Sequence, residues 1–261
     1  MGGTTAREPA EGDLLARFDR QLRRDAGEEA PGGRVVRRAG GADGWSGVLW
    51  SDLDEETADA EIRAQIRHFA GLGPGGFEWK LYAHDRPADL GERLRAAGFA
   101  AEPVETVMVA AVGDLPRDAG PPEGIELVPV TDAAGVERVA EVHESAFGPG
   151  RVRIREQLLA QLEAGPDAVA AVLAMAGRTP VSAARIELYP GTEFAGLWGG
   201  GTVPGWRGRG IYRALVAYRT RLAAERGVRH LQVDASAHSE PILRRLGFAP
   251  LTTTTPWVHP G

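Results

Sequence analysis

The sequence predicts an α/β (α+β) fold made of two similar units, and three features of the chain support this fold class. Residues 202–212 join an expected strand to an expected helix through a loop with three glycines and two arginines. The segment LRAAGF at 94–99 can be placed over LRRLGF at 243–248, which indicates an internal duplication. Proline and glycine are dense at 113–124, as expected for an irregular connector. We therefore expect a first unit at 1–115, a linker at 116–123 and a second unit at 124–261.

Hydrophobic spacing defines the expected elements of the second unit. Apolar residues recur at helical spacing from Ile211 to Leu222, and Gly227 follows where a C-terminal cap would lie. The other expected elements are strand 125–129, helices 133–146 and 154–163, strands 168–174, 180–187, 194–203 and 228–234, and a short helix that ends at 246.

The first unit is expected to repeat the second half of that series. Its expected elements are a strand at 48–50, a helix with the apolar stripe Ile62, Ile66 and Phe69, a strand at 77–83, a short helix before Gly98 and a terminal strand. Strand 77–83 corresponds to residues 230–235 of the second unit. An amphipathic N-terminal helix carries Leu14, Leu15, Phe18 and Leu22, and its mixed charges favour a packed brace over a membrane-binding segment.

The loop before residue 211 has the composition of an anion-binding helix start. The first turn of a helix leaves main-chain N–H groups unpaired, and the helix dipole adds partial positive charge there. Gly208 and Gly210 lack a Cβ and would let an anion approach the main chain, while Arg207 and Arg209 would add charge. Glycines that serve only the turn are the alternative. The sequence lacks Gly-x-Gly-x-x-Gly and Gly-Lys-Ser/Thr in this loop, so neither nucleotide-binding fingerprint fits better.

The order of loop, helix, alternating strand 228–234 and Leu246-Gly247-Phe248 corner resembles the GNAT superfamily of acyl-CoA-dependent N-acyltransferases. The resemblance covers roughly residues 124–261. It implies a mixed, mostly antiparallel twisted sheet flanked by helices in each unit, with acetyl-CoA as co-substrate. One departure is Tyr212, which stands where the family usually has Gly or Ala. The implied coenzyme-binding residues are Gly201, Thr202, Val203, Arg207, Gly208, Arg209, Gly210, Ile211, Tyr212 and Ser236.

Three consecutive glycines, at 199–201, are unfavourable in the interior of an ordinary strand, so something is expected to lie close to this backbone. In the family this strand splays from its neighbour, pantetheine lies in the gap, and a main-chain N–H polarises the thioester carbonyl. The resemblance therefore points to Gly201, Thr202 and Val203 as the residues of this strand that contact the coenzyme. A β-bulge is the structural alternative.

Direct acyl transfer requires a neutral amine, and an alkyl amine with a pKa of about 10.4 is mostly protonated at pH 7. Candidates for the base are Glu193, Asp234 and Glu144, each with a solvated or capping role as the alternative. In the family, the segment between the first two helices helps to form the acceptor pocket. By that resemblance, the candidates for substrate contact are His143, Glu144, Phe147 and Arg151.

The family's usual proton donor to the thiolate does not carry over to this chain. The tyrosine position is occupied by Leu243, and the usual asparagine is replaced by Ser236. Ser239 and Ser236 are alternatives near the sulfur, although Ser239 also fits a helix N-cap before Glu240. Catalysis by positioning and water is therefore expected to dominate.

The first unit is expected to keep the scaffold without a coenzyme site. Its strand-to-helix junction at 51–56 has no glycine and several carboxylates, which would repel a pyrophosphate. This resembles tandem GNAT proteins of the mycothiol synthase kind, in which one half commonly serves structure. The first unit would then complete a sheet, cover a face or shape the acceptor pocket.

Composition narrows the class of protein. Of the 261 residues 43% are hydrophobic, as in globular proteins, and neither a membrane-spanning run nor a secretory segment is evident, so a cytoplasmic protein is expected. The absence of cysteine excludes disulfides, thiolate metal sites and a cysteine nucleophile, and six scattered histidines predict no metal site. A formal charge of −6 disfavours nucleic acid as a partner and suits a cationic amine.

The predicted function is an acyl-CoA-dependent N-acyltransferase that transfers acetyl from acetyl-CoA to a primary amine in a ternary complex. The acceptor would be a small-molecule amine or a protein lysine. The alternatives are a catalytically inactive acyl-CoA-binding sensor or interaction module, and a loop with a structural role only.

Overall fold

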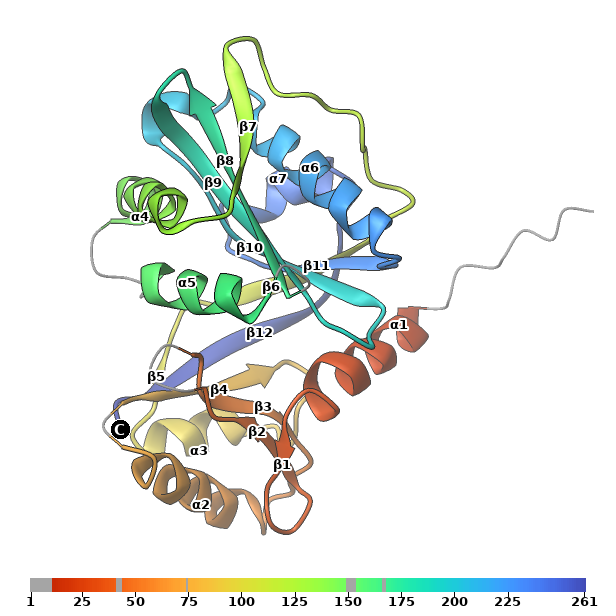
Figure 1. The fold of residues 1–261 in the computed structure, drawn as a ribbon. Coiled ribbons are helices and arrows are strands. Elements are labelled where there is room, and N and C mark those ends of the chain that lie inside the picture. Colours follow the sequence, from red (N-terminus) through yellow and green to blue (C-terminus); the bar gives the residue numbers. More distant parts are fainter. Residues whose placement is uncertain (1–10, 41–43, 74, 149–153, 166–167) are drawn as a thin grey trace, which may run out of the picture. The chain divides into compact units, whose positions relative to one another are not determined.

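The structure is a computed structural model that describes residues 11–40, 44–73, 75–148, 154–165 and 168–261 (Figure 1). The chain forms two compact units, and each is described by itself. The first unit comprises the described residues of Met1–Gly41, Trp45–Val107 and Pro250–Gly261. The second comprises those of Ala42–Gly44 and Met108–Ala249.

The helices and strands of the first unit come from both ends of the sequence. They are α1 (Glu11–Phe18), the π-helix η1 (Asp19–Arg24), β1 (Glu28–Glu29), β2 (Val35–Arg38), β3 (Gly47–Ser51), α2 (Ala58–Ala70), β4 (Phe77–Tyr82), α3 (Leu90–Ala96), β5 (Ala100–Ala101) and β12 (Ala249–His259). The strands follow the order β1-β2-β3-β4-β12, with β5 also pairing with β12. The pair β3–β4 is parallel, and β4–β12 is antiparallel.

One apolar core joins the sheet of the first unit to α2 and α3. It contains Val48, Ile62, Trp79, Leu94 and Trp257, together with neighbouring apolar residues. In β4, the buried residues Phe77 and Trp79 alternate with less buried ones, as the strand period of two requires. The predicted N-terminal helix is present, although its second half is the π-helix η1.

The sequence-based boundary between the units requires a correction. Residues 250–261 were expected in the second unit, but β12 pairs with β4 from Phe77↔His259 to Tyr82↔Thr254. The indole of Trp257 is 5% exposed within the first unit's core. Burial of this aromatic side chain and the continuous ladder with β4 place the C-terminal strand with the first unit.

The second unit contains the elements expected around the glycine loop. They are β6 (Glu105–Ala111, from Met108 onward), β7 (Ile125–Val130), α4 (Ala133–Phe147), α5 (Ile154–Ala164), β8 (Val169–Ala176), β9 (Thr179–Leu188), β10 (Phe194–Thr202), the 3₁₀ turn η2 (Pro204–Trp206), α6 (Ile211–Glu225), β11 (His230–Ala235) and α7 (Glu240–Arg245). The strand order is β6-β11-β10-β9-β8-β7. Strands β7 to β10 pair antiparallel in sequence, and β10–β11 is parallel.

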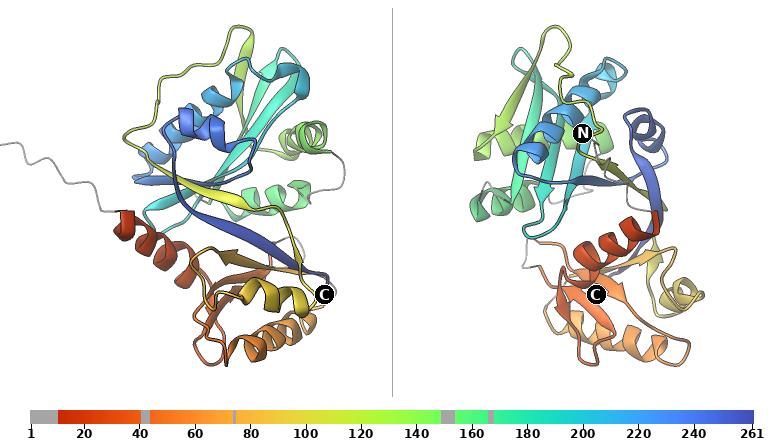
Figure 2. Two further views of the ribbon diagram at one scale, coloured as in Figure 1. Left: turned by 180° about the vertical axis from the view of Figure 1, so that it is seen from behind. Right: turned by 90° about the vertical axis from the view of Figure 1, so that its right-hand side faces the viewer.

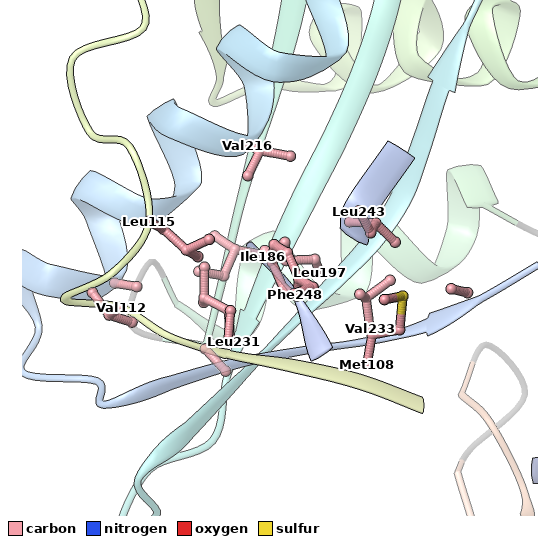
Figure 3. Packing of buried hydrophobic residues seen from close by; sticks show 14 of the residues in the cluster. Met108, Val112, Leu115, Ile186, Leu197, Val216, Leu231, Val233, Leu243 and Phe248 are labelled. Carbon is pink, nitrogen blue, oxygen red and sulfur yellow. The ribbon is translucent and has the colours of Figure 1, made fainter. Parts of the chain in front are cut away.

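Helices cover both faces of this sheet. Helices α6 and α7 lie on one face, and α4 and α5 lie on the other (Figure 2). The α6 face is apolar: Ile186, Leu197, Leu231 and Val233 pack there with Val216 of α6 (Figure 3). The predicted α/β class, with mixed and mostly antiparallel sheets flanked by helices, is therefore confirmed. No helix in the described part of the chain has both the length and the apolar character needed to cross a membrane.

Candidate coenzyme and acceptor site

The two central strands of the second unit separate toward their C-terminal ends. Strands β10 and β11 pair only from Phe194↔His230 to Gly196↔Gln232, although β10 continues to Thr202. On its other edge, β10 carries a bulge, because Trp198 pairs with Arg185 and the next pair is Gly201↔Ala183. The splayed strand and the β-bulge, which were alternative expectations, are therefore both present.

The protein's own side chains lie against the three consecutive glycines. Gly199 lies in the bulge, and its φ of +60° favours glycine. A Cβ at Gly200 would lie 3.0 Å from the Tyr212 ring, and one at Gly201 would lie 2.7 Å from the Phe147 ring. The glycines thus let α4 and α6 approach β10 closely at the point where it leaves β11.

The glycine loop after β10 presents a run of main-chain N–H groups. Gly208 and Gly210 have φ values of +75° and +83°, and Gly210 is the N-cap residue of α6. Within the described chain, the amides of residues 208–213 have no hydrogen-bond acceptor, and the helix ladder begins with Ala214 N–H donating to Gly210 O. Six consecutive N–H groups at an exposed helix start can bind an oxyanion such as a phosphate.

The two loop arginines have different surroundings. The Nε of Arg207 donates to Thr202 O at 3.0 Å, and its Nη2 donates to Ala146 O at 3.1 Å. Arg207 therefore ties the loop to the ends of β10 and α4, whereas a free charge at the rim was expected. The guanidinium of Arg209 lies 4.6 Å from the Trp206 ring centroid and is exposed, so it can reach an anion at the loop.

Tyr212 leaves the loop open despite its size. Its ring lies against Gly200, and its side chain is hydrogen-bonded to Arg219, so it points toward the sheet. Arg219 is 1% exposed, and its Nη1 donates to Arg185 O at 3.2 Å, opposite the bulge. Burial lowers the pKa of this guanidinium. Arg219 is thus a positioning residue that links the start of α6 to the bulge.

The face of β9, β10 and β11 that points away from α6 carries polar side chains. Its members, which follow the strand period of two, are Arg185 and Glu187 on β9, Trp198 on β10, and Gln232 and Asp234 on β11. The Oε1 of Glu187 accepts from Arg185 Nε at 2.9 Å and from Gln161 Nε2 of α5 at 3.0 Å. We call these five strand residues the polar face.

Tyr189 is hydrogen-bonded to two residues of the polar face, near the point where β10 and β11 separate. Its Oη accepts from Trp198 Nε1 at 3.0 Å, and its side chain is also hydrogen-bonded to Gln232. Burial, followed by the charge of Glu187, raises the pKa of Tyr189 well above its ordinary value, so the phenol stays neutral. Within the described residues, the buried Oε1 atoms of Gln161 and Gln232 have no hydrogen-bond partner. Buried acceptors of this kind favour a ligand with N–H donors.

His143 of α4 approaches the bulge from the same side. Its Nε2 lies 3.1 Å from Gly199 O, and its ring is 5.1 Å from that of Phe147. Burial lowers the pKa of His143; the hydrogen bond to Gly199 opposes this effect, and the charge of Arg185 adds to it.

The lowered pKa of His143 predicts a pH dependence of stability. The unfolded chain takes up a proton at His143 near pH 6.5, and the folded chain resists it, so stability falls as the pH falls below about 6.5. We expect the free energy of unfolding, measured by urea at pH 7.5 and 5.5, to fall less in His143→Gln than in the wild type. An identical decrease in both proteins would contradict this assignment.

The other base candidates lie away from the loop. Glu193 precedes β10 and pairs with Arg229 at 2.9 Å. Because β10 has nine residues, Glu193 is separated from the loop by roughly 30 Å along the strand, at ~3.3 Å per residue. Glu144 is exposed on α4, next to His143. Asp234 alone among the three lies on the polar face, at the end of β11 where the strands separate.

The serines and Leu243 occupy the turn after β11 and the helix that follows. Ser239 is the N-cap residue of α7, but its hydroxyl donates to Ser236 O at 3.2 Å and caps no N–H. Ser236 is exposed, with its Oγ 3.2 Å from that of Ser239. Leu243 is fully buried in the core under α6 and α7, so its position offers no proton donor. Arg151, a candidate for substrate contact, lies outside the described residues.

The strand-to-helix junction of the first unit, at 51–56, carries a carboxylate at the start of α2. Asp54 Oδ1 accepts from Thr57 N at 2.8 Å, from Thr57 Oγ1 at 2.7 Å and from Glu56 N at 3.1 Å. The hydrogen bonds from Thr57 lower the pKa of Asp54. A carboxylate thus occupies the start of α2, where its charge would repel a pyrophosphate.

Sequence reasoning missed Tyr189, Trp198, Gln232 and Arg219. The period-two placement of polar residues at 185–187 and 232–234 was the available signal for the polar face. Arg219 carries no such signal, because a charged residue on a surface helix is ordinarily solvated. No cluster of three or more His, Cys, Asp or Glu side chains suited to a metal ion occurs among the described residues.

Solved structures with similar folds include proteins named as N-acetyltransferases. No protein-family model and no curated protein matches the chain. A GCN5-related N-acetyltransferase from Kribbella flavida has a TM-score of 0.68 at 19% identity, over 98% of this chain and 97% of that one. A functionally unknown protein from Staphylococcus epidermidis has a TM-score of 0.70 at 13% identity, over 95% and 99%. A tandem GNAT protein from the clavulanic acid biosynthesis pathway has a TM-score of 0.59 at 15% identity, over 99% and 90%.

Proposed function

We propose that this chain, which has the fold of tandem GNAT proteins, is an acyl-CoA-dependent N-acyltransferase that transfers acetyl from acetyl-CoA to a primary amine. The observation that carries the proposal is the run of unpaired amides at 208–213, at the start of α6. These N–H groups, with the exposed Arg209, fit the diphosphate of coenzyme A. The pantetheine arm is proposed to pair with main-chain groups of β10 beyond Gly196, where β10 and β11 no longer pair.

The acceptor amine is proposed to bind on the polar face. Carboxylates at Glu187 and Asp234 and the unpaired Oε1 atoms of Gln161 and Gln232 suit an ammonium group with several N–H donors. Glu187 already accepts two hydrogen bonds, so it is engaged in holding Arg185 and Gln161. Asp234, at the end of β11 where the strands separate, is the proposed group that takes a proton from the amine.

In the proposed reaction the neutral amine nitrogen attacks the thioester carbon, a C–N bond forms, and the C–S bond breaks to release the coenzyme thiolate. Main-chain N–H groups near Gly201 and the bulge would stabilise the oxyanion. Asp234 would accept the amine proton, directly or through water. Water would return a proton to the thiolate, since Leu243 has no proton to give and the Ser239 hydroxyl is engaged.

A pair of carboxylate-to-amide variants tests the base. Asp234→Asn is expected to lower kcat at least about 100-fold with little change in acetyl-CoA affinity, because general-base catalysis contributes 10²–10⁴-fold. Glu193→Gln removes a carboxylate at the opposite end of β10, and its kcat should stay within about twofold of the wild type. Steady-state kinetics by thiol release, with calorimetry for acetyl-CoA, measures both. Equal losses in the two variants would rule out the assignment of Asp234.

The whole proposal is tested by calorimetric titration with acetyl-CoA, combined with a thiol-release assay over a panel of amines. We expect binding, and release of coenzyme A with cationic amines ahead of neutral ones. Binding without turnover for any acceptor would favour a sensor or interaction module. No binding would favour a structural role for the loop.

A further inference from the structure

The first unit contains a cleft that the proposed function does not use. Its volume is about 400 Å³, and it lies between α2 and the segment that carries β1 and β2. The lining residues are Pro31, Arg37, Glu61, Ala64, Gln65, Arg67 and His68. This volume falls within the range of about 300–1,000 Å³ that is typical of small-molecule sites.

Arg37 of β2 is a buried cation whose hydrogen bonds to the described residues are long. The residue is 8% exposed. Its Nη1 lies 3.3 Å from Gln65 Oε1 and its Nη2 lies 3.4 Å from Glu28 Oε1, whereas charge-assisted bonds are usually about 2.7–2.9 Å. The carboxylate of Glu28 is itself 72% exposed, and the buried Nε of Arg37 has no hydrogen-bond partner among the described residues.

A second buried arginine of the same unit, Arg23, makes close hydrogen bonds to charged groups and serves as a comparison. Arg23 is 1% exposed and donates to the Asp85 carboxylate at 2.6 and 2.7 Å and to Asp19 at 2.6 Å. Its Nε donates to Leu49 O at 3.0 Å. Since a buried charge without close partners is costly, the contrast indicates that the described residues leave the guanidinium of Arg37 short of close partners.

We propose that this cleft binds a small organic oxyanion, a carboxylate or a phosphate, which pairs with the guanidinium of Arg37. The planar fork of an arginine matches both groups in a bidentate arrangement. Arg67 and His68 add donors at the cleft, and Glu61 disfavours a polyanion there. The volume of the cleft leaves room for an organic body beside the oxyanion group.

The charge of Arg37 also acts on His68 in the same cleft. Burial, followed by the positive charge of Arg37, lowers the pKa of His68, while Glu28 opposes the effect. An anion on Arg37 would offset that charge and raise the pKa of His68. The site is independent of the acyl-transfer proposal, because neither its residues nor its test involve coenzyme A.

The test follows the Arg37 Nε–H resonance by NMR during separate titrations with sodium acetate and sodium phosphate, with sodium chloride at matched ionic strength as the control. We expect a saturable shift with one or both oxyanions, and the stronger one identifies the headgroup. Arg37→Gln should abolish the saturable response and bind at least about tenfold more weakly. Arg38→Gln, which alters the exposed neighbouring arginine, should leave the response unchanged.

Thermal unfolding gives a second readout on the same proteins. The oxyanion should raise the Tm of the wild type and of Arg38→Gln above the chloride control, and it should not raise that of Arg37→Gln. The NMR titration of the full-length wild type tests oxyanion binding at Arg37 even if Arg37→Gln fails to fold. A linear response that chloride reproduces, or equal responses in the two variants, would overturn the proposal.

Discussion

Gly208→Glu is expected to lower the affinity for acetyl-CoA at least about 100-fold, which corresponds to ~2.8 kcal/mol. Gly208 has a φ of +75°, where an L-residue is strained by about 1–2 kcal/mol, so the substitution would distort the loop. The new carboxylate would also stand beside the amides that are proposed to receive the diphosphate. Calorimetric titration with acetyl-CoA measures the affinity, and circular dichroism checks the fold.

Gly191→Glu is the matched control for that experiment. Gly191 has a φ of +79°, and a Cβ added at either glycine would meet no other described group within 4 Å, so the two variants share charge and backbone strain. Gly191 lies in the turn before β10, at the opposite end from the loop. Its acetyl-CoA affinity should stay within about threefold of the wild type. Unchanged binding in Gly208→Glu, or an equal loss in both variants, would contradict the assignment of the loop.

Trp257→Ala is expected to destabilise the first unit by about 3–5 kcal/mol, the usual cost of removing a buried aromatic side chain. The indole pairs across the ladder with Trp79 and packs in the core shared with α2 and α3. Urea unfolding measures the loss, and hydrogen exchange shows where it occurs. Amides of β4 should lose protection, because β12 pairs with that strand.

The next residue of the same strand supplies the comparison for Trp257. Val258 is 36% exposed, so Val258→Ala should cost less than about 1 kcal/mol. If both variants lose equal stability, burial of the indole is not what holds β12. If amides of the second unit lose protection in place of those in β4, the assignment of the C-terminal strand to the first unit is wrong.

The sequence predicted local structure better than it predicted strand partners. Apolar spacing located α6, and the glycine pattern located the turn before it, because both signals lie within a few neighbouring residues. Strand β4, which pairs with β12, lies more than 170 positions away in the chain, and alternation in β12 is compatible with pairing in either unit. The predicted division therefore differs from the compact units, which place residues 108–115 in the second unit and residues 250–261 in the first.

The sequence also predicted only part of the candidate site. The run of glycines at 199–201 correctly predicted close approach to the backbone, but the sequence could not say that the Tyr212 and Phe147 rings would make it. Arg207 was expected to face an anion, yet it donates to the carbonyl groups of Thr202 at the end of β10 and of Ala146 on α4. The polar face depends on the register between β9, β10 and β11, which only the paired strands reveal.

A crystal structure of the protein with acetyl-CoA tests the central claim most directly. We expect the diphosphate oxygens to lie within about 3.2 Å of main-chain nitrogens of residues 208–213, with pantetheine between β10 and β11. Acetyl-CoA bound at another surface, or crystals grown at saturating acetyl-CoA that leave these amides without a diphosphate, would contradict it.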